Sequence, residues 1–282
     1  MINKWAIFSD VDGTIYPFPD KTLSTNTINK TKELSLKNIP FVINTGNGPF
    51  NKIQRLCDQL SSRYIVCSNG ALIFDNLTKE ILHVEYMPVA EVEKVFQVAK
   101  ETNVGLYYFG THQYYLHLYT QEFKEFISEF CEYNDWITDG SIPNDVHKVE
   151  IYGPRENLVN FYNLAKERNI DLNICDVKSH IEITKSNVSK GTGAKWLCDN
   201  VFEMNIKDAM TVGDSQNDIS MFELSDYAYV MDNADNHTKG YAKFFTSDVK
   251  QDGLVEAIDD YLYRSDFELK RMVSQGKKKI SR

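Results

Sequence analysis

The chain has 282 residues, of which 42% are hydrophobic and 25% charged, and its formal net charge is −9. This length allows one large domain or two ordinary ones, and the composition is that of a globular protein with ample apolar residues for a core. The acidic balance argues against a nucleic-acid partner, which would favour a basic stripe, but permits a phosphate substrate where local cations neutralise it.

The cysteines and the hydropathy pattern bear on where the protein resides. Five cysteines occur at wide spacings without a C-x-x-C pair: Cys57, Cys67, Cys131, Cys175 and Cys198. This argues against a disulfide framework or a structural zinc site and favours a reducing, cytoplasmic setting. No signal-peptide pattern is visible, and no run approaches the roughly 20 apolar residues of a membrane span, so we expect no membrane partner. The sequence does not indicate an oligomeric state.

The first predicted strand leads directly into two carboxylates. Residues 5–8 are apolar and aromatic, and Asp10, Asp12, Gly13 and Thr14 follow. The C-terminal end of such a strand lies at the edge where open α/β sheets bind ligands. Asp10 could attack phosphorus, Asp12 could serve as general acid and then base, and Gly13 would let the backbone approach an anion. The alternative is a polar turn whose aspartates cap the next segment.

Strands and helices then alternate. The expected elements are a proline-rich loop at 16–19, a helix at 24–37, a strand at 39–43, a helix from Pro49 and a strand at 64–67. The two strands end in polar turns at 44–47 and 68–70. Short strand–helix–strand links are typical of a parallel sheet with right-handed crossovers, so these turns should meet the first one at a shared edge.

The pattern changes after a predicted hairpin of 71–74 and 80–84. The segment 85–185 is expected to form helices at 89–101, 122–132 and 156–168 and strands at 105–109, 114–119, 148–152, 172–175 and 180–184. Such runs predict an inserted α+β domain with a mainly antiparallel sheet. Its many aromatic residues are expected to fill that sheet's core, and at least one of them could touch a substrate.

The C-terminal part returns to the first pattern. A polar connector at 186–189 precedes a helix beginning at Lys190, and a strand at 209–212 runs into the turn 213–218. The remaining elements are a helix at 219–224, a strand at 227–231 and a closing helix at 254–263. We expect the basic tail after Asp266 to be a solvated, partly frayed end.

Polar residues from distant segments are therefore predicted to converge at one sheet edge. They are Asp10, Asp12, Thr45, Asn69, Asp214, Asn217 and Asp218. Four carboxylates in one place would repel one another, and Mg²⁺ with oxygen ligands resolves that conflict. Thr45 offers a hydroxyl and Lys190 a compact cation for a phosphate group. Phosphoryl transfer needs mainly positioning and charge neutralisation, which this set supplies.

Four ordered motifs resemble those of the haloacid dehalogenase superfamily. They are D-V-D-G-T at 10–14, Thr45-Gly46, Lys190-Gly191 and G-D-S-Q-N-D at 213–218. The insertion between the second and third motifs is similar to the Cof-type phosphatase branch, which has a large α/β cap. The resemblance implies an α/β fold with a Rossmann-like parallel-sheet core at 1–84 and 186–282 and an inserted cap domain at 85–185 that determines substrate specificity.

The resemblance also implies roles for individual residues. Asp10 would be the nucleophile, and Asp12 the acid and base with its backbone carbonyl on the metal. The implied Mg²⁺ site comprises Asp10, Asp12, Asp214 and Asp218, the last acting directly or through water. The implied phosphoryl-binding residues are Thr45, Gly46, Lys190 and Asn217.

Two departures from the resemblance affect the pocket. Many relatives carry arginine after the Thr-Gly pair, whereas Asn47 follows here and removes a cation. The segment 16–19, Tyr-Pro-Phe-Pro, is bulkier than the usual continuation and is expected to narrow the entrance.

The first functional hypothesis is a Mg²⁺-dependent phosphatase that hydrolyses a small phosphorylated metabolite, a sugar phosphate or a phosphorylated cofactor, through an aspartyl-phosphate. The alternatives are a phosphomutase of the same superfamily and a non-catalytic sensor of a phosphorylated ligand. Fold alone does not separate them.

Overall fold

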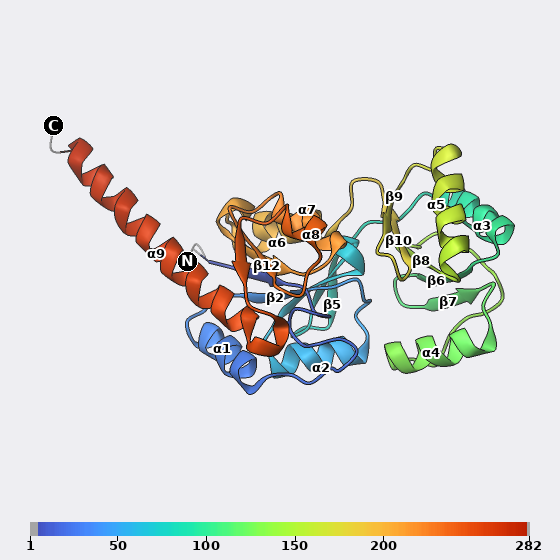
Figure 1. The fold of residues 1–282 in the computed structure, drawn as a ribbon, viewed down its shortest axis with the longest axis horizontal. Helices are drawn as coiled ribbons and strands as arrows, with labels where there is room; N and C mark the ends of the chain where they lie inside the picture. The colour runs from blue at the N-terminus through green and yellow to red at the C-terminus, as the bar shows by residue number, and fades with distance from the viewer. Residues whose placement is uncertain (1–4, 281–282) are drawn as a thin grey trace.

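The computed structural model describes residues 5–280, with side chains described through residue 267. Figure 1 shows two α/β bodies side by side, with the C-terminal helix projecting away from both. The first body is built on a sheet of strand order β13-β12-β11-β1-β2-β3-β4-β5, and the second on a sheet of order β7-β6-β8-β10-β9.

The first sheet comprises β1 (Ile7–Ser9), β2 (Phe41–Asn44), β3 (Tyr64–Cys67), β4 (Leu72–Asp75), β5 (Glu80–Val84), β11 (Met210–Gly213), β12 (Tyr227–Met231) and β13 (Phe244–Thr246). Strands β13 to β3 pair in parallel, and β4 and β5 add an antiparallel hairpin at one edge. This order confirms the predicted α/β class with a parallel-sheet core. The register places Ser9 opposite both Val212 and Ile43, so the residues after these strands lie at one edge.

Helices cover both faces of this sheet. They are α1 (Thr25–Leu36), α2 (Asn51–Gln59), α6 (Lys190–Leu197), α7 (Ile219–Phe222), α8 (Asn236–Lys239) and α9 (Gly253–Ile280). One apolar core joins the sheet to α1, α2 and the first turns of α9, including Leu34, Ile53 and Ile258. A second core on the opposite face holds α6 through Ala194 and Leu197. Figure 1 shows α1 and α2 on one side of the sheet and α6 on the other.

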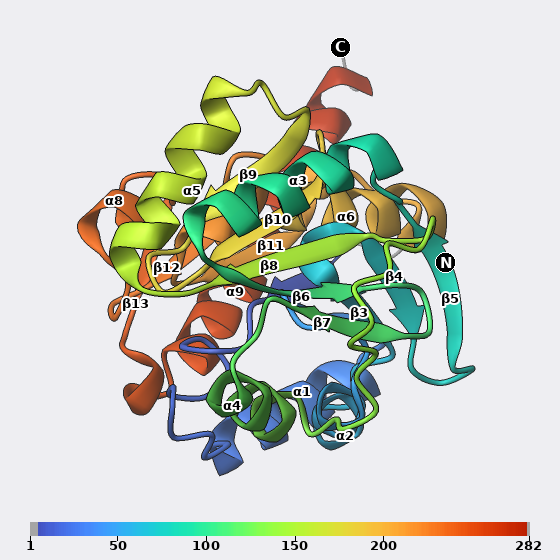
Figure 2. The same cartoon turned by 90° about the vertical axis from the view of Figure 1, so that its right-hand side faces the viewer.

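The second sheet comprises β6 (Gly105–Phe109), β7 (Tyr114–His117), β8 (Lys148–Tyr152), β9 (Leu172–Asp176) and β10 (Ile181–Lys185), all paired antiparallel. Helices α3 (Val89–Thr102) and α5 (Arg155–Glu167) cover one face, and α4 (Gln121–Cys131) lies on the other, as Figure 2 shows. Phe50 of the first body packs into the aromatic cluster under α4. The two bodies therefore share an apolar contact.

Several boundaries differ from the sequence prediction. The helix expected to close at Tyr263 continues as α9 to Ile280, so the prediction of a frayed backbone after Asp266 is wrong. The side chains after residue 267 lie outside the described residues. Residues 264–272 contain good helix formers and no glycine or proline, so nothing there ends the helix. Helix α8 and strand β13 were not predicted. Among the described residues, no helix combines the length and apolar character needed to cross a membrane.

Candidate active site

Three carboxylates meet at the C-terminal edge of the parallel sheet. Asp10 follows β1, Asp214 follows β11, and Asp218 ends the short helix η4 (Gln216–Asp218) that comes next. One carboxylate oxygen from each of the three lies within 4.8 Å of the others. Asp10 and Asp218 are 6% and 0% exposed. The structure thus brings together residues from opposite ends of the sequence, as predicted from their positions at strand ends.

Lys190 sits against two of these carboxylates. It is the first residue of α6, which is fixed by a capping box at Ser189. Its Nζ donates to Asp10 Oδ1 at 2.5 Å and to Asp218 Oδ1 at 2.7 Å. An ammonium group has three protons, so one remains to bind an incoming oxygen.

The charge of this cluster is not balanced by the protein. Three carboxylates and one ammonium leave a formal charge of −2 if all are ionised. Burial raises the pKa of Asp10 well above its usual range, Lys190 lowers it, and Asp218 and Asp214 raise it further. Burial, together with the charge of Asp218, raises the pKa of Asp214 to about 7. A buried, oxygen-lined cluster that lacks two positive charges fits a divalent cation.

Asp218 organises the turn that holds Asp214. Its Oδ2 accepts hydrogen bonds from the backbone N–H groups of Asp214 at 3.0 Å and Ser215 at 2.9 Å, while its Oδ1 accepts from Lys190. A Cβ atom at Gly213 would lie 2.3 Å from the Asp218 carboxyl carbon, so only glycine fits there. Both oxygens of Asp218 accept hydrogen bonds from protein donors, so Asp218 fixes the position of the turn that carries Asp214.

The first carboxylate motif packs against Asp214. Gly13 has φ +91°, and a Cβ atom there would lie 2.3 Å from Asp214 Oδ2, so glycine is required for both reasons. Thr14 Oγ1 donates to Asp214 Oδ1 at 3.3 Å. Burial raises the pKa of Asp12, and Lys52 is the largest influence in the opposite direction. A carboxyl that holds its proton more tightly is suited to general acid catalysis.

The turn after β2 presents a hydroxyl group. Thr45 Oγ1 accepts hydrogen bonds from Asn47 N at 3.1 Å and Asn47 Nδ2 at 3.2 Å, which leaves its own proton free to donate. Asn47 follows the Thr-Gly pair in this chain. Its side chain holds the threonine hydroxyl in place and adds no charge.

Asn217 faces the second body. Its Nδ2 donates to Glu182 Oε2 at 3.0 Å and to Asn69 Oδ1 at 3.4 Å, and its Oδ1 accepts from Ser215 Oγ at 2.8 Å. Asn69 therefore lies at the converging edge, as expected from its strand end. The amide of Asn217 is already occupied by protein partners, so its binding to a phosphoryl group stays a prediction.

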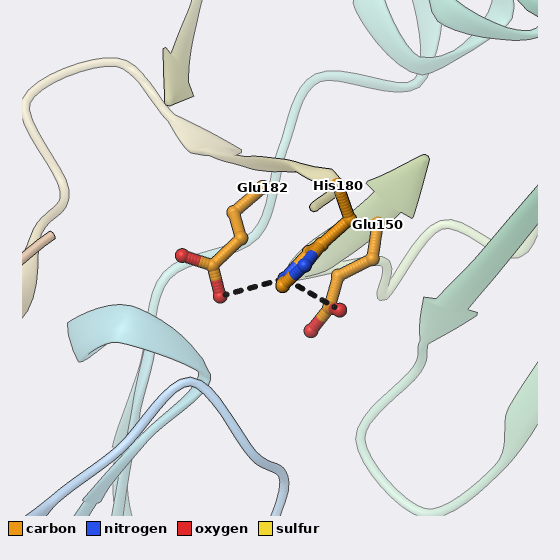
Figure 3. A group of neighbouring side chains, drawn as sticks. All are labelled: Glu150, His180 and Glu182. Atoms are coloured by element: carbon orange, nitrogen blue, oxygen red, sulfur yellow. Dashed lines mark ion pairs between the residues drawn. The ribbon is translucent and has the colours of Figure 1, made fainter. Parts of the chain in front are cut away.

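The second body contributes a charged cluster that the sequence analysis missed. Lys148 is fully buried, and its Nζ donates to Glu150 Oε1 at 2.5 Å, to Glu182 Oε1 at 2.8 Å and to the Gly46 carbonyl at 2.6 Å. Figure 3 shows the His180 imidazole between the carboxylates of Glu150 and Glu182. The sequence of β8 could have indicated this cluster. Lys148, Glu150 and Tyr152 alternate with apolar residues, so one face of a strand inside the protein is polar and charged.

One cavity of about 570 Å³ connects the two groups. Its lining includes Asp10, Asp12, Thr45 and Asp214 from the first body and Glu150, Tyr152, His180 and Glu182 from the second. Tyr107 also reaches it, while most other aromatics of the second sheet lie in its core. Pro17 and Phe18 of the predicted loop also line this cavity.

Comparison with known proteins places the chain in a family. The family described as haloacid dehalogenase-like hydrolase matches residues 7–258. The chain is 26% identical over 255 residues to a phosphoglycolate phosphatase of Methanosarcina acetivorans, covering 90% of this chain and 95% of that protein.

Two solved structures share the fold. The haloacid dehalogenase subclass IIB sugar phosphatase BT4131 superposes with a TM-score of 0.79 at 20% identity, covering 91% of this chain and 98% of that one. A haloacid dehalogenase-like hydrolase of Bacillus subtilis superposes with a TM-score of 0.77 at 19% identity, covering 90% and 98%. The family match over residues 7–258 shows that this protein belongs to the haloacid dehalogenase-like hydrolase family.

Proposed function

We propose that this chain is a Mg²⁺-dependent phosphatase that hydrolyses a small phosphorylated metabolite, such as a sugar phosphate or a phosphorylated cofactor, through an aspartyl-phosphate on Asp10. The observation that carries the proposal is the contact of Lys190 with Asp10 beside Asp214, since Asp10 and Asp214 line a cavity large enough for a small metabolite. The phosphatase names of similar proteins support it. The proposed setting is the cytoplasm, and the proposed partner is a small molecule, not a nucleic acid.

Asp10, Asp214 and the backbone carbonyl of Asp12 would hold the Mg²⁺ ion, and Asp218 would support it directly or through water. The charge deficit of the carboxylate cluster, described above, is consistent with this site. When bound, the ion neutralises negative charge on the phosphoryl oxygens. Its carboxylate ligands lie on the tight turns that Gly13 and Gly213 permit, so the site is preorganised.

The reaction proceeds in two steps on the residues of the chain. Asp10 attacks phosphorus, and the bond to the leaving oxygen breaks as Asp12 gives that oxygen its proton. Asp12 then takes a proton from water, and the resulting hydroxide attacks phosphorus and releases Asp10 and phosphate. The third proton of Lys190 and the Thr45 hydroxyl bind the phosphoryl oxygens throughout, with Gly46 and Asn217 assisting.

The proposed function assigns a separate role to each of two domains. Residues 1–84 and 186–282 form the catalytic core domain, and residues 85–185 form the cap domain over the leaving group. The two separate sheets support this division, and the contacts of Lys148 with Gly46 and of Glu182 with Asn217 join the cap residues to the phosphate-binding turns.

The decisive experiment compares the wild type with Asp10→Asn in an assay of phosphate release from a panel of phosphorylated metabolites, with and without EDTA. We expect both the substitution and the chelator to abolish release. Retained turnover by Asp10→Asn would refute the nucleophile. Formation of an isomeric phosphate ester faster than free phosphate would indicate a mutase, and binding without turnover in Mg²⁺ would indicate a sensor.

A further inference from the structure

The cap wall opposite Asp10 carries two glutamates that would normally repel each other. Glu150 of β8 and Glu182 of β10 are directly opposite in the antiparallel register. They are 3% and 4% exposed, and like charges at such a position destabilise a sheet. The nearby ammonium of Lys148 compensates one of the two charges, so the trio retains a formal charge of −1.

This cluster borders the phosphate-binding turn. A Cβ atom at Gly46 would lie 2.6 Å from Glu182 Oε1, so that carboxylate is next to the residue that follows Thr45. Glu150, Glu182 and His180 line the same cavity as Asp10. A leaving group of a few carbon atoms attached to a phosphoryl group at Asp10 would therefore meet this wall.

The polar donors of the wall are already in use. The three protons of Lys148 go to Gly46, Glu150 and Glu182. The Asn217 amide donates to Asn69 and Glu182, and the Tyr152 hydroxyl donates to Glu150 at 2.8 Å. What remains for a ligand is the unused accepting capacity of the carboxylate oxygens.

His180 faces both glutamates. Burial lowers the pKa of its imidazole, but Glu182 and Glu150 outweigh burial and the net pKa lies above the ordinary value, so the trio keeps its charge of −1 at a pH where the imidazole is neutral. Its Nε2 faces Glu150 Oε2 at 3.4 Å and Glu182 Oε1 at 3.8 Å, and its Nδ1 lies 3.0 Å from Ser179 Oγ. The ring also stacks on Tyr152, with centroids 4.8 Å apart and planes 6° apart. Both nitrogens thus face protein oxygens. A metal ion between the glutamates would have to compete with the Lys148 ammonium, which already lies 2.5 and 2.8 Å from them.

We propose that Glu150 and Glu182 select the leaving group by charge: they accept hydrogen bonds from the hydroxyl groups of a neutral polyol phosphate and disfavour a carboxylate. The proposal rests on the proposed phosphatase function and deepens it. It separates this chain from the similar proteins named phosphoglycolate phosphatase, whose named substrate carries a carboxylate.

The test uses two substrates of nearly equal size. Phosphoglycolate and 2-hydroxyethyl phosphate differ only in a carboxylate against a hydroxymethyl group. We expect the wild type, assayed at alkaline pH so that the His180 imidazole is neutral, to hydrolyse 2-hydroxyethyl phosphate with a kcat/KM at least about tenfold higher than that for phosphoglycolate. The reason is that the phosphoglycolate carboxylate would face the glutamates unpaired in the transition state. Equal values, or a preference for phosphoglycolate, would overturn the inference.

Variants assign the preference to the residues. Glu150→Gln and Glu182→Gln should each lower the ratio of the two kcat/KM values by about tenfold, because each removes one repelling charge. The ratio is measured within one variant, so a general loss of activity cancels. Glu182→Asp keeps the charge and should keep the preference. Glu156→Gln, which removes an exposed charge of the cap outside the cavity, should leave the ratio at its wild-type value.

An unchanged ratio in both glutamine variants would also overturn the inference. Failure of the proposed function gives a different result, which p-nitrophenyl phosphate detects. Its leaving group has no carboxylate and no further hydroxyl group, so the glutamates should not select for or against it. If the wild type shows no Asp10-dependent release of phosphate even from this substrate, the proposed function is wrong. In that case both proposals fall together.

Discussion

Replacing Lys148 with methionine should destabilise the protein strongly. The side chain is 0% exposed, and its ammonium group makes hydrogen bonds to two buried carboxylates and to the Gly46 carbonyl. Methionine fills a similar volume but provides no donor or charge. Removing one partner of a buried ion network costs about 3–5 kcal/mol, because the remaining charges are left desolvated and uncompensated.

The effect should depend on pH in a defined direction. Burial raises the pKa of Glu182, but Lys148 and His180 together outweigh it, and the net pKa lies well below the ordinary value. A depressed carboxyl pKa stabilises the folded state above the unfolded pKa, and that stability is lost as pH falls through the folded pKa. Without Lys148, only His180 opposes the effect of burial, so the pKa of Glu182 rises and Glu182 takes up a proton more readily as the solution is acidified. The difference between wild type and variant should therefore shrink from pH 7 to pH 4.5.

Urea unfolding followed by circular dichroism at both pH values measures this difference. Lys243→Met is the matched control, since Lys243 pairs with Asp226 at 2.5 Å but both side chains are exposed, 47% and 61%. An exposed pair contributes about 0–1 kcal/mol, so the control should stay close to wild type. A loss below about 1 kcal/mol for Lys148→Met, equal at both pH values, would refute the reasoning.

Three further predictions concern the carboxylate cluster. Asp10→Asn should lower phosphate release by at least about 10³-fold without lowering the melting temperature, because it removes a nucleophile that is also a buried charge; a melting point lowered in step with activity would point to misfolding. EDTA should abolish turnover and excess Mg²⁺ should restore it, and unchanged activity after dialysis against EDTA would contradict the metal site. The pKa of Asp214 is raised by burial to about 7, so its contribution to stability is present at low pH and lost as pH rises through 7. Metal-free protein should thus melt at a higher temperature at pH 5.5 than at pH 8, and saturating Mg²⁺ should remove that trend; a trend of opposite sign in the metal-free protein would contradict the assignment.

The core site could be predicted because local patterns carry it. Asp10, Thr45 and Asp214 each follow a short apolar run, and parallel strands align their C-terminal ends, so strand order alone brings these residues together. Lys190 was predicted from its place at a helix start after a polar connector. The structure adds which carboxylates it contacts.

The cap side of the site could not be predicted in the same way. Lys148 and Glu182 are far apart in sequence, and their contact depends on an antiparallel register and on how the cap is seated over Gly46. Neither property has a local signature. The extension of α9 was missed for a different reason. Its basic composition suggested a solvated tail, but residues 264–272 contain no glycine or proline that would end the helix.

The bond from Lys148 to the Gly46 carbonyl has a consequence for how such enzymes diversify. A lysine of the second body donates a hydrogen bond to the main chain of the first body, so the two bodies are not freely interchangeable. A chimera that receives the second body of another protein should keep its activity only if that body supplies an ammonium group that can donate to the Gly46 carbonyl.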